Sequence, residues 1–264
     1  MITIKEYVAP KSIEKAYEIL MARKNNIILG GCGFIKLGSK NIGTAIDLCN
    51  LSLDYIIENE DKILIGADTT LRQLETNNII KNYCGGAISQ GVSNIVGVQF
   101  RNMARVGASV FSKYGFSDLL PSLLVLDARV RLYNGGVMDL KYFLEKKYDK
   151  DILLEVILPK KDGIAEFDCL RKSSGDLSII NGAMFRSKGG EYRIAIGSRP
   201  QRAKLAEKAA KDLGDGLNIE KAADRAVDEL HFGTNMRGRK EYREDMCKVL
   251  IKRMHDRVGD YHDR

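Results

Sequence analysis

Long apolar runs are absent from this sequence of 264 residues. A helix that spans a membrane needs about 20 consecutive, mainly apolar residues, and no stretch approaches that length. The opening segment, MITIKEYVAPKSIEKAYEIL, has no charged region followed by an apolar one, so we expect no secretory signal and a cytoplasmic protein. With 44% hydrophobic and 29% charged residues, the composition is typical of a soluble globular protein.

Closely spaced cysteines are also missing. No two of the five cysteines lie closer than 17 positions in the chain. This spacing excludes the C-x-x-C pairs that commonly hold zinc or iron–sulfur centres. We therefore expect free thiols in a reducing compartment and no metal site. The five are Cys32, Cys49, Cys84, Cys169 and Cys247.

The net charge is +7, but the sequence has no purely basic stretch in the region that carries most of the excess. In MRGRKEYREDMCKVLIKRM, near the C-terminus, acids alternate with bases. Solvated helix faces, or a docking surface for an acidic partner subunit, fit this pattern better than a nucleic-acid groove. The candidate docking residues are Arg237, Arg239, Lys240 and Arg243.

The hydrophobic pattern predicts an α+β protein without internal repeats. Residues 2–8 favour a strand, Ser12 a helix N-cap, and Asn26 to Leu29 a second strand. Hairpins are predicted about Asn59-Glu60-Asp61 and about Asn134-Gly135. From about Asp151, four strand patterns at hairpin spacing precede three helical patterns, which predicts a second lobe built on an antiparallel sheet.

Glycines cluster directly after the second predicted strand, in LGGCGFIKLGSK, residues 29–40. Backbone N–H groups in such a loop can converge on an anion, although a tight turn alone would also explain the glycines. The G-x-G-x-x-G fingerprint of dinucleotide-binding folds fails at Lys36. A P-loop is disfavoured as well, because Ser39-Lys40 reverses the Lys-Ser/Thr order that ATP hydrolysis needs.

A second small-residue stretch, RNMARVGASVFSKYGFSDLLPSLLVLDARVRL, spans residues 101–132. Ala104, Gly107, Ala108 and Ser109 could present backbone donors and one hydroxyl to phosphate oxygens. Asp118 lies eleven positions past Gly107 and directly before an apolar helix. It could cap that helix, accept ribose hydroxyls, or do both.

These motifs together resemble the FAD-binding subunits of the molybdenum hydroxylases, such as the flavin chains of xanthine dehydrogenase and carbon monoxide dehydrogenase. The family's first loop, A-G-G-T/H-D/S, appears here as residues 29–33, and its T-I/V-G-G-N/S motif as residues 105–109. Its S-D-x-x-P motif and the following L-D-A appear as residues 117–121 and 126–128. The resemblance implies that FAD contacts Leu29, Gly30, Gly31, Cys32, Gly33, Phe34, Ile35, Arg105, Val106, Gly107, Ala108, Ser109, Asp118, Leu153 and Arg171.

The resemblance also implies a fold and a function. The fold would be the PCMH-type FAD-binding fold over residues 1–158, with subdomains of about 1–54 and 55–158, followed by a C-terminal α+β domain over residues 159–264. The function would be electron transfer from [2Fe–2S] centres of a partner, through FAD, to NAD or another acceptor. The partners would be a [2Fe–2S] subunit and a molybdopterin-binding subunit, and no catalytic acid or base is expected in this chain.

Departures from the family pattern leave two alternatives open. Arg105 replaces a Thr, Ala108 replaces the second Gly, and Cys32 and Gly33 replace polar residues of the first loop. Arg105 removes a hydroxyl but adds a cation that could neutralise phosphate charge. The alternatives are a stand-alone flavin reductase of the same fold, and a basic scaffold or nucleic-acid-binding subunit whose flavin loops have degenerated.

Overall fold

The computed structural model describes residues 1–259, which form two compact units. The first unit contains residues 1–73, 98–112 and 129–158. The second contains residues 74–97 and 113–128 and the chain from Pro159 onward. Each unit is therefore assembled from three separate stretches of chain.

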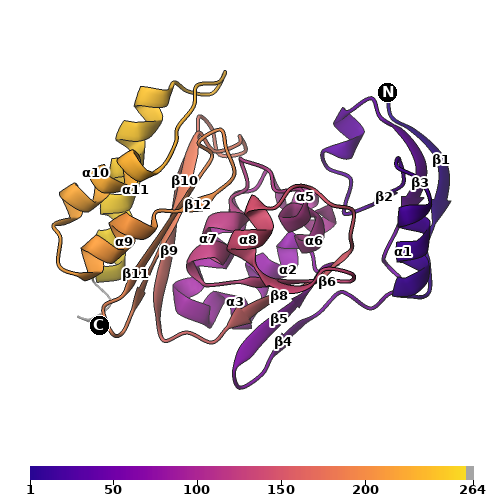
Figure 1. Ribbon diagram of the computed structural model, residues 1–264, viewed down its shortest axis with the longest axis horizontal. Helices are drawn as coiled ribbons and strands as arrows, with labels where there is room; N and C mark the ends of the chain where they lie inside the picture. The colour runs from indigo at the N-terminus through magenta and orange to yellow at the C-terminus, as the bar shows by residue number, and fades with distance from the viewer. Residues whose placement is uncertain (260–264) are drawn as a thin grey trace. The chain divides into compact units, whose positions relative to one another are not determined.

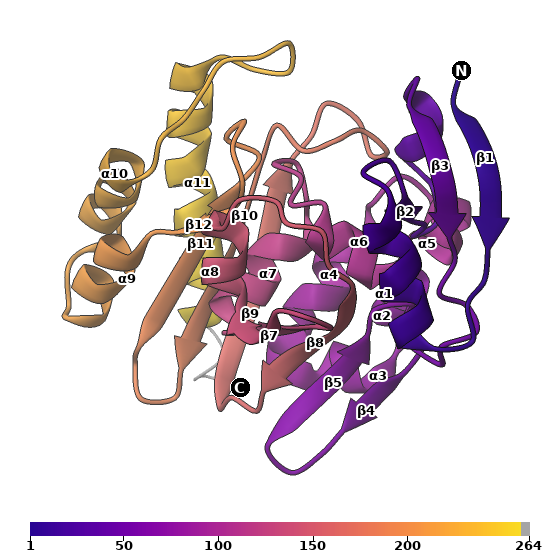
Figure 2. The ribbon, with the colours of Figure 1, turned by 45° about the vertical axis from the view of Figure 1, so that its right-hand side comes forward.

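A small parallel sheet in the order β1-β3-β2 begins the first unit. Helix α1 packs against β3 (Figure 2), and Ala16 and Leu20 form a core with Ile46. The predicted N-cap is confirmed, because the Ser12 side chain accepts a hydrogen bond from the N–H of Lys15 at 3.3 Å. The elements are β1 (Thr3–Val8), α1 (Ile13–Ala22), β2 (Ile27–Ile28), the short 3-10 helix η1 (Ile35–Leu37) and β3 (Asn41–Ile46).

The second sheet of this unit has the order β4-β5-β8-β6-β7. Both predicted hairpins are confirmed, as β4–β5 and β6–β7. The sequence pattern had grouped β8 with the C-terminal strands, and this is wrong: β8 lies between β5 and β6, and its nearly continuous burial is typical of a central strand. The elements are β4 (Ile56–Glu58), β5 (Lys62–Gly66), α5 (Val98–Met103), α6 (Val106–Phe111), β6 (Arg129–Leu132), β7 (Gly136–Asp139), α8 (Leu140–Glu145) and β8 (Leu153–Pro159), and α2 (Leu71–Thr76) leads out of this unit.

The second unit is built on the antiparallel sheet β12-β11-β10-β9. The three predicted C-terminal helices are confirmed as α9, α10 and α11, which cover one face of this sheet (Figure 1) around an apolar core that includes Ile194, Ala209 and Ile251. The α+β class is therefore confirmed. The elements are β9 (Gly163–Leu170), β10 (Ile180–Ser187), β11 (Tyr192–Gly197), β12 (Lys204–Leu205), α9 (Glu207–Gly214), α10 (Ile219–Glu229) and α11 (Lys240–Gly259).

Helix α7 (Leu119–Val125) packs against β9, β10 and β11, and all of its residues are buried. Before it in the same unit come α3 (Asn78–Asn82), the 3-10 segment η2 (Tyr83–Gly86) and α4 (Ala87–Ser93), and α4 contacts both α7 and β9. Over the described residues, none of the helices has the length and apolar character that a membrane span requires.

Candidate functional site

The glycine-rich loop after β2 carries a row of free backbone donors. The N–H of Leu29 donates to the carbonyl of Ile46 at 2.8 Å, so the loop starts in register with β3. Over residues 1–259, no hydrogen bond is donated by the next four N–H groups, those of residues 30–33, which lie in half-buried backbone. Gly31 and Cys32 have φ of 83° and 57°, which turns the chain sharply. Consecutive free N–H groups in such a turn can bind an anion.

The glycines of this loop face the protein rather than an open space. A Cβ added to Gly30 would lie 2.1 Å from the Cβ of Ala108, and one added to Gly31 would lie 2.0 Å from the carbonyl oxygen of Met103. At Gly33 the added atom would meet the ring of Phe100 at 2.4 Å. The two small-residue stretches therefore pack on each other. This packing leaves no space for a Cβ at these positions, whereas the N–H groups of the loop remain available.

The second stretch offers fewer donors than expected. The N–H of Val106 donates to the carbonyl of Thr69 at 2.9 Å, and that of Gly107 to the carbonyl of Ala67 at 2.8 Å. Gly107 is needed for this close approach, because an added Cβ would lie 2.7 Å from the Cβ of Ala67. The Ser109 hydroxyl donates to the carbonyl of Arg105 at 2.8 Å. In this stretch the N–H of Ala108 has no partner among the described residues, so the expectation of several phosphate donors here is wrong.

Arg105 pairs with Asp68 within the first unit. Its Nη1 donates to the backbone carbonyl of Asp68 at 2.9 Å, and its Nε lies 3.4 Å from the carboxylate. Burial raises the pKa of the Asp68 carboxyl, and the Arg105 guanidinium opposes that rise. Sequence reasoning missed Asp68, although an acid that closely follows a buried strand was a usable signal. Burial also raises the pKa of the Cys32 thiol, and the nearby Asp47 carboxylate adds to this.

In the second unit, Asp118 is the centre of a buried polar cluster. Its Oδ1 accepts hydrogen bonds from the Ser178 hydroxyl and the Asn181 amide, both at 2.6 Å, and its Oδ2 lies 2.8 Å from Nη2 of Arg171. The Asp118 and Arg171 side chains are 4% and 8% exposed. Asp118 makes no side-chain cap hydrogen bond, so its predicted role as the cap of α7 is wrong. Its contact with a ribose stays a prediction.

All three nitrogens of the Arg171 guanidinium donate hydrogen bonds. Besides Asp118, it donates to the backbone carbonyl of Asp176 at 2.8 Å and to the sulfur of Cys169 at 3.3 Å. Burial raises the pKa of the Cys169 thiol, which Arg171 opposes. Sequence reasoning did not find Ser178 or Asn181, because nothing in the local pattern marks them as partners of an acid 60 or more positions away.

The remaining predicted residues lie in the first unit. The Phe34 ring stands edge-to-face with Phe100 at 6.2 Å between ring centres, and Ile35 begins η1. Leu153 begins β8 at an irregularity of the β6–β8 pairing and is 4% exposed. The structure thus brings residues 30–33 against residues 100–108 in one unit, and Asp118 against Arg171 in the other.

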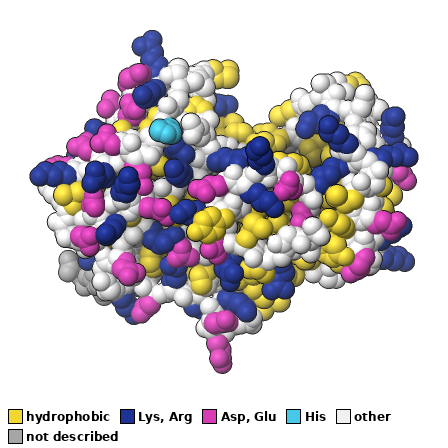
Figure 3. All heavy atoms as spheres, viewed as in Figure 1, with side chains coloured by type: hydrophobic (Ala, Val, Ile, Leu, Met, Phe, Trp, Pro, Cys, Tyr) yellow, Lys and Arg dark blue, Asp and Glu magenta, His cyan; other side chains and the backbone are white. Residues whose placement is uncertain are grey.

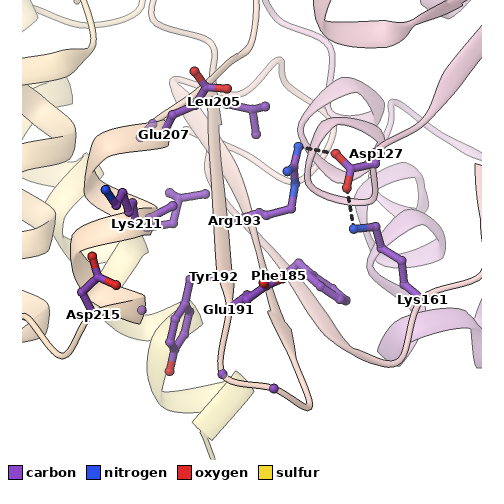
Figure 4. A pocket seen from close by; sticks show the side chains of 16 residues that line it. Asp127, Lys161, Phe185, Glu191, Tyr192, Arg193, Leu205, Glu207, Lys211 and Asp215 are labelled. Carbon is purple, nitrogen blue, oxygen red and sulfur yellow. Dashed lines mark ion pairs between the residues drawn. The ribbon is translucent and has the colours of Figure 1, made fainter.

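A pocket of about 480 Å³ lies in the second unit, between α9 and the edge of β11 (Figure 4). On its inner wall, Asp127 forms ion pairs with Lys161 and Arg193. Asp127 also ends α7 in the left-handed region, with φ of 53°, so these ion pairs fix the end of a buried helix. None of the residues predicted to contact FAD is among the described residues that line this pocket.

The predicted basic docking surface is partly wrong. Arg243 is 1% exposed, and its guanidinium donates to the carbonyls of Ile179, Gly233 and Gly238 and to the Asn235 side chain. Lysines and arginines mix with acids over the α9–α11 side of the view in Figure 3. Two of the predicted docking residues are likewise paired with acids: Arg237 with Asp176, and Lys240 with Glu244.

Comparisons with known proteins agree with the fold. Residues 3–161 match the family described as the FAD binding domain in molybdopterin dehydrogenase, and residues 165–258 match the CO dehydrogenase flavoprotein C-terminal domain. The first match covers more than half of the chain, so the chain belongs to this family of FAD-binding domains. It is an FAD-binding oxidoreductase flavoprotein with the PCMH-type fold.

Individual relatives lie at low sequence identity. The chain is 24% identical to an uncharacterized protein, YgfM, of Escherichia coli K12, over 94% of each chain. It is 27% identical to the nicotinate dehydrogenase FAD-subunit of Eubacterium barkeri, over 68% of this chain and 67% of that one. The solved structure of quinoline 2-oxidoreductase from Pseudomonas putida 86 superposes with a TM-score of 0.87 at 20% identity, over 97% of this chain and 96% of the other.

The residues present fit an FAD cofactor. A diphosphate needs several hydrogen-bond donors, and the unpartnered N–H groups of residues 30–33, together with that of Ala108, come from two segments that touch. Arg105 adds a cation to the second of these segments. Family membership and these donors both argue against the non-flavin scaffold considered from the sequence.

Proposed function

We propose that this chain is the electron-transfer subunit of a molybdenum hydroxylase complex, located in the cytoplasm. It would receive electrons from [2Fe–2S] centres on a partner chain and pass them through FAD to NAD or another acceptor. The observation that carries this proposal is the row of four free N–H groups at residues 30–33, in a chain whose family binds FAD. Bound FAD would supply the redox chemistry, while the protein binds and orients it.

The partners follow from what the sequence offers. Its five cysteines are too far apart for a paired C-x-x-C ligand set, so the iron–sulfur centres belong on another chain. Hydroxylation would take place on a molybdopterin-binding chain. A relative named as the FAD-subunit of nicotinate dehydrogenase supports such a division of labour. We expect FAD to lie against residues 29–35 and 105–109 of the first unit, with Leu153 as a further contact.

The experiment combines a spectrum with a pull-down. The purified chain should show the visible bands of oxidised flavin, oxidise NADH slowly with an artificial acceptor, and hydroxylate no heterocycle. Purification from its native cell should recover one chain with cysteine clusters and one large molybdopterin-binding chain. Hydroxylation by the isolated chain, or a native complex without both partners, would contradict the proposal. If the isolated chain completes a reductase reaction without any partner, the alternative of a stand-alone flavin reductase would be favoured.

A further inference from the structure

Arg105 occupies a position where its side chain is locally unfavourable. It is the N-cap of α6, where Ser, Thr, Asp and Asn are preferred because their oxygens accept hydrogen bonds from the first N–H groups. Arg105 makes no such hydrogen bond, and its positive charge lies at the amino end of the helix. Residues that break a local rule in this way are concentrated at functional sites.

Asp68 contacts Arg105 through its backbone carbonyl and through its carboxylate, and the two contacts have different effects. Its backbone carbonyl accepts a hydrogen bond from Nη1 at 2.9 Å, which is a well-formed contact that orients the guanidinium. Its carboxylate lies 3.4 Å from Nε, longer than a strong charge-assisted hydrogen bond, and supplies mainly charge. Nη2 has no partner among residues 1–259.

The backbone on either side of Arg105 packs against the glycine-rich loop. Gly31 packs on Met103 and Ala104, directly before Arg105, and Gly30 packs on Ala108, directly after Gly107. Asp47 and Asp54 are close enough to raise the pKa of the Asp68 carboxyl further, so several acids share these surroundings. A diphosphate held by the loop would be repelled by these acids and attracted by Arg105.

We propose that Arg105 is the counter-ion of the FAD diphosphate. In the flavin-free chain, Asp68 balances the charge of Arg105 instead. Asp68 thereby limits the affinity of the chain for FAD. The inference rests on flavin binding by this chain and is independent of the path of the electrons. Because Asp68→Asn keeps the orienting carbonyl and removes only the negative charge, it should strengthen FAD binding.

The test measures the dissociation constant of FAD, from flavin fluorescence, and the Tm of the flavin-free full-length chain. Asp68→Asn should lower the dissociation constant about three- to tenfold and also lower the Tm, because Arg105 loses its counter-charge. Arg105→Thr should raise the dissociation constant about tenfold or more, whereas Arg105→Lys, which keeps the positive charge, should retain most of the wild-type affinity. In the double variant Asp68→Asn with Arg105→Thr, the dissociation constant should lie within about threefold of the wild-type value.

The matched control is Asp54→Asn. Asp54 belongs to the same group of acids but is held by the Gln73 amide at 2.7 Å instead of by Arg105, so FAD affinity should change less than about twofold. A purely structural role for Asp68 would lower the Tm and weaken FAD binding together. Asp68→Asn with an unchanged or raised dissociation constant therefore overturns the proposal. A wild-type chain without FAD affinity would instead contradict flavin binding itself.

Discussion

Asp118 and Arg171 form an ion pair, with 2.8 Å between Oδ2 and Nη2, in which both side chains are more than nine-tenths buried. Removal of one partner from such a pair leaves a buried charge without compensation, which typically costs about 3–5 kcal/mol. Loss of a helix cap, the role that the sequence had suggested for Asp118, would cost only about 1 kcal/mol. The ion pair therefore predicts a larger loss of stability on mutation of Asp118 than a helix cap would.

We expect Asp118→Ala to lower the free energy of unfolding by about 3–5 kcal/mol, measured by urea denaturation. Joint replacement as Asp118→Leu and Arg171→Met should recover a large part, because neither charge is then left alone. The control is Arg129→Ala, which breaks a half-exposed pair with Asp139 and should cost at most about 1 kcal/mol. A cost near 1 kcal/mol for Asp118→Ala would argue against a buried charge pair.

Gly31→Val should destabilise the protein as well as abolish flavin binding. The new Cβ would overlap the Met103 carbonyl, and a β-branched residue does not tolerate φ of 83°, so we expect a loss of about 3 kcal/mol or more. Gly38→Ala is the control, because its backbone is extended and the nearest atom would lie at 3.4 Å. Tm and FAD affinity should both fall in the first variant and stay nearly constant in the second. An unchanged Tm for Gly31→Val would mean that the two stretches do not pack as described.

Arg243→Met should be among the most damaging substitutions on α11. It would leave the carbonyls of Ile179, Gly233 and Gly238 without their donor, at about 1–3 kcal/mol for each group that stays buried. Arg239→Ala, at an exposed position one turn earlier, should change stability by no more than about 0.5 kcal/mol. Urea unfolding of both variants checks this. Equal effects would mean that Arg243 is a surface residue, as its sequence context had suggested.

Stability should fall in alkali partly because of Cys247. Burial raises the pKa of this thiol to about 12, so the folded state keeps its proton where the unfolded state loses it, above about pH 9. Its contribution is intact below pH 9 and should decline by about 1.4 kcal/mol per pH unit up to about pH 12. Cys247→Ala should make the decline of unfolding free energy between pH 9 and 11 shallower. The exposed Cys49, changed to Ala, serves as control, and an equal slope in both variants would contradict the assignment.

The sequence predicted features that depend on neighbours along the chain. The cap at Ser12, the two hairpins and the glycine-rich loop all follow from residues a few positions apart, where turn and capping chemistry decides. The partners of Asp118 could not be predicted in this way. They lie 53 to 63 positions away, on β10 and in the loop between β9 and β10, and only the folded sheet brings them together.

Arg243 was mispredicted for a related reason. Alternating acids and bases on a helix usually indicate a solvated face, and most of α11 fits that rule. The carbonyls that bind Arg243 belong to Ile179, in the loop between β9 and β10, and to residues 233–238, whose position near the helix has no signature in the local charge pattern. The glycines were located correctly but explained incompletely, since what their Cα atoms touch is a property of tertiary packing.

The interleaved path of the chain restricts how this protein can be divided experimentally. A fragment of residues 1–158 would contain α4 and α7 without β9, β10 and β11, the strands on which they pack. Seven buried residues of α7, four of them leucines, would then face water. We expect such a fragment to aggregate, although the boundary matches a natural division of the sequence into two families. For this protein, the stretches that the two family models match and the stretches that form a compact unit are different.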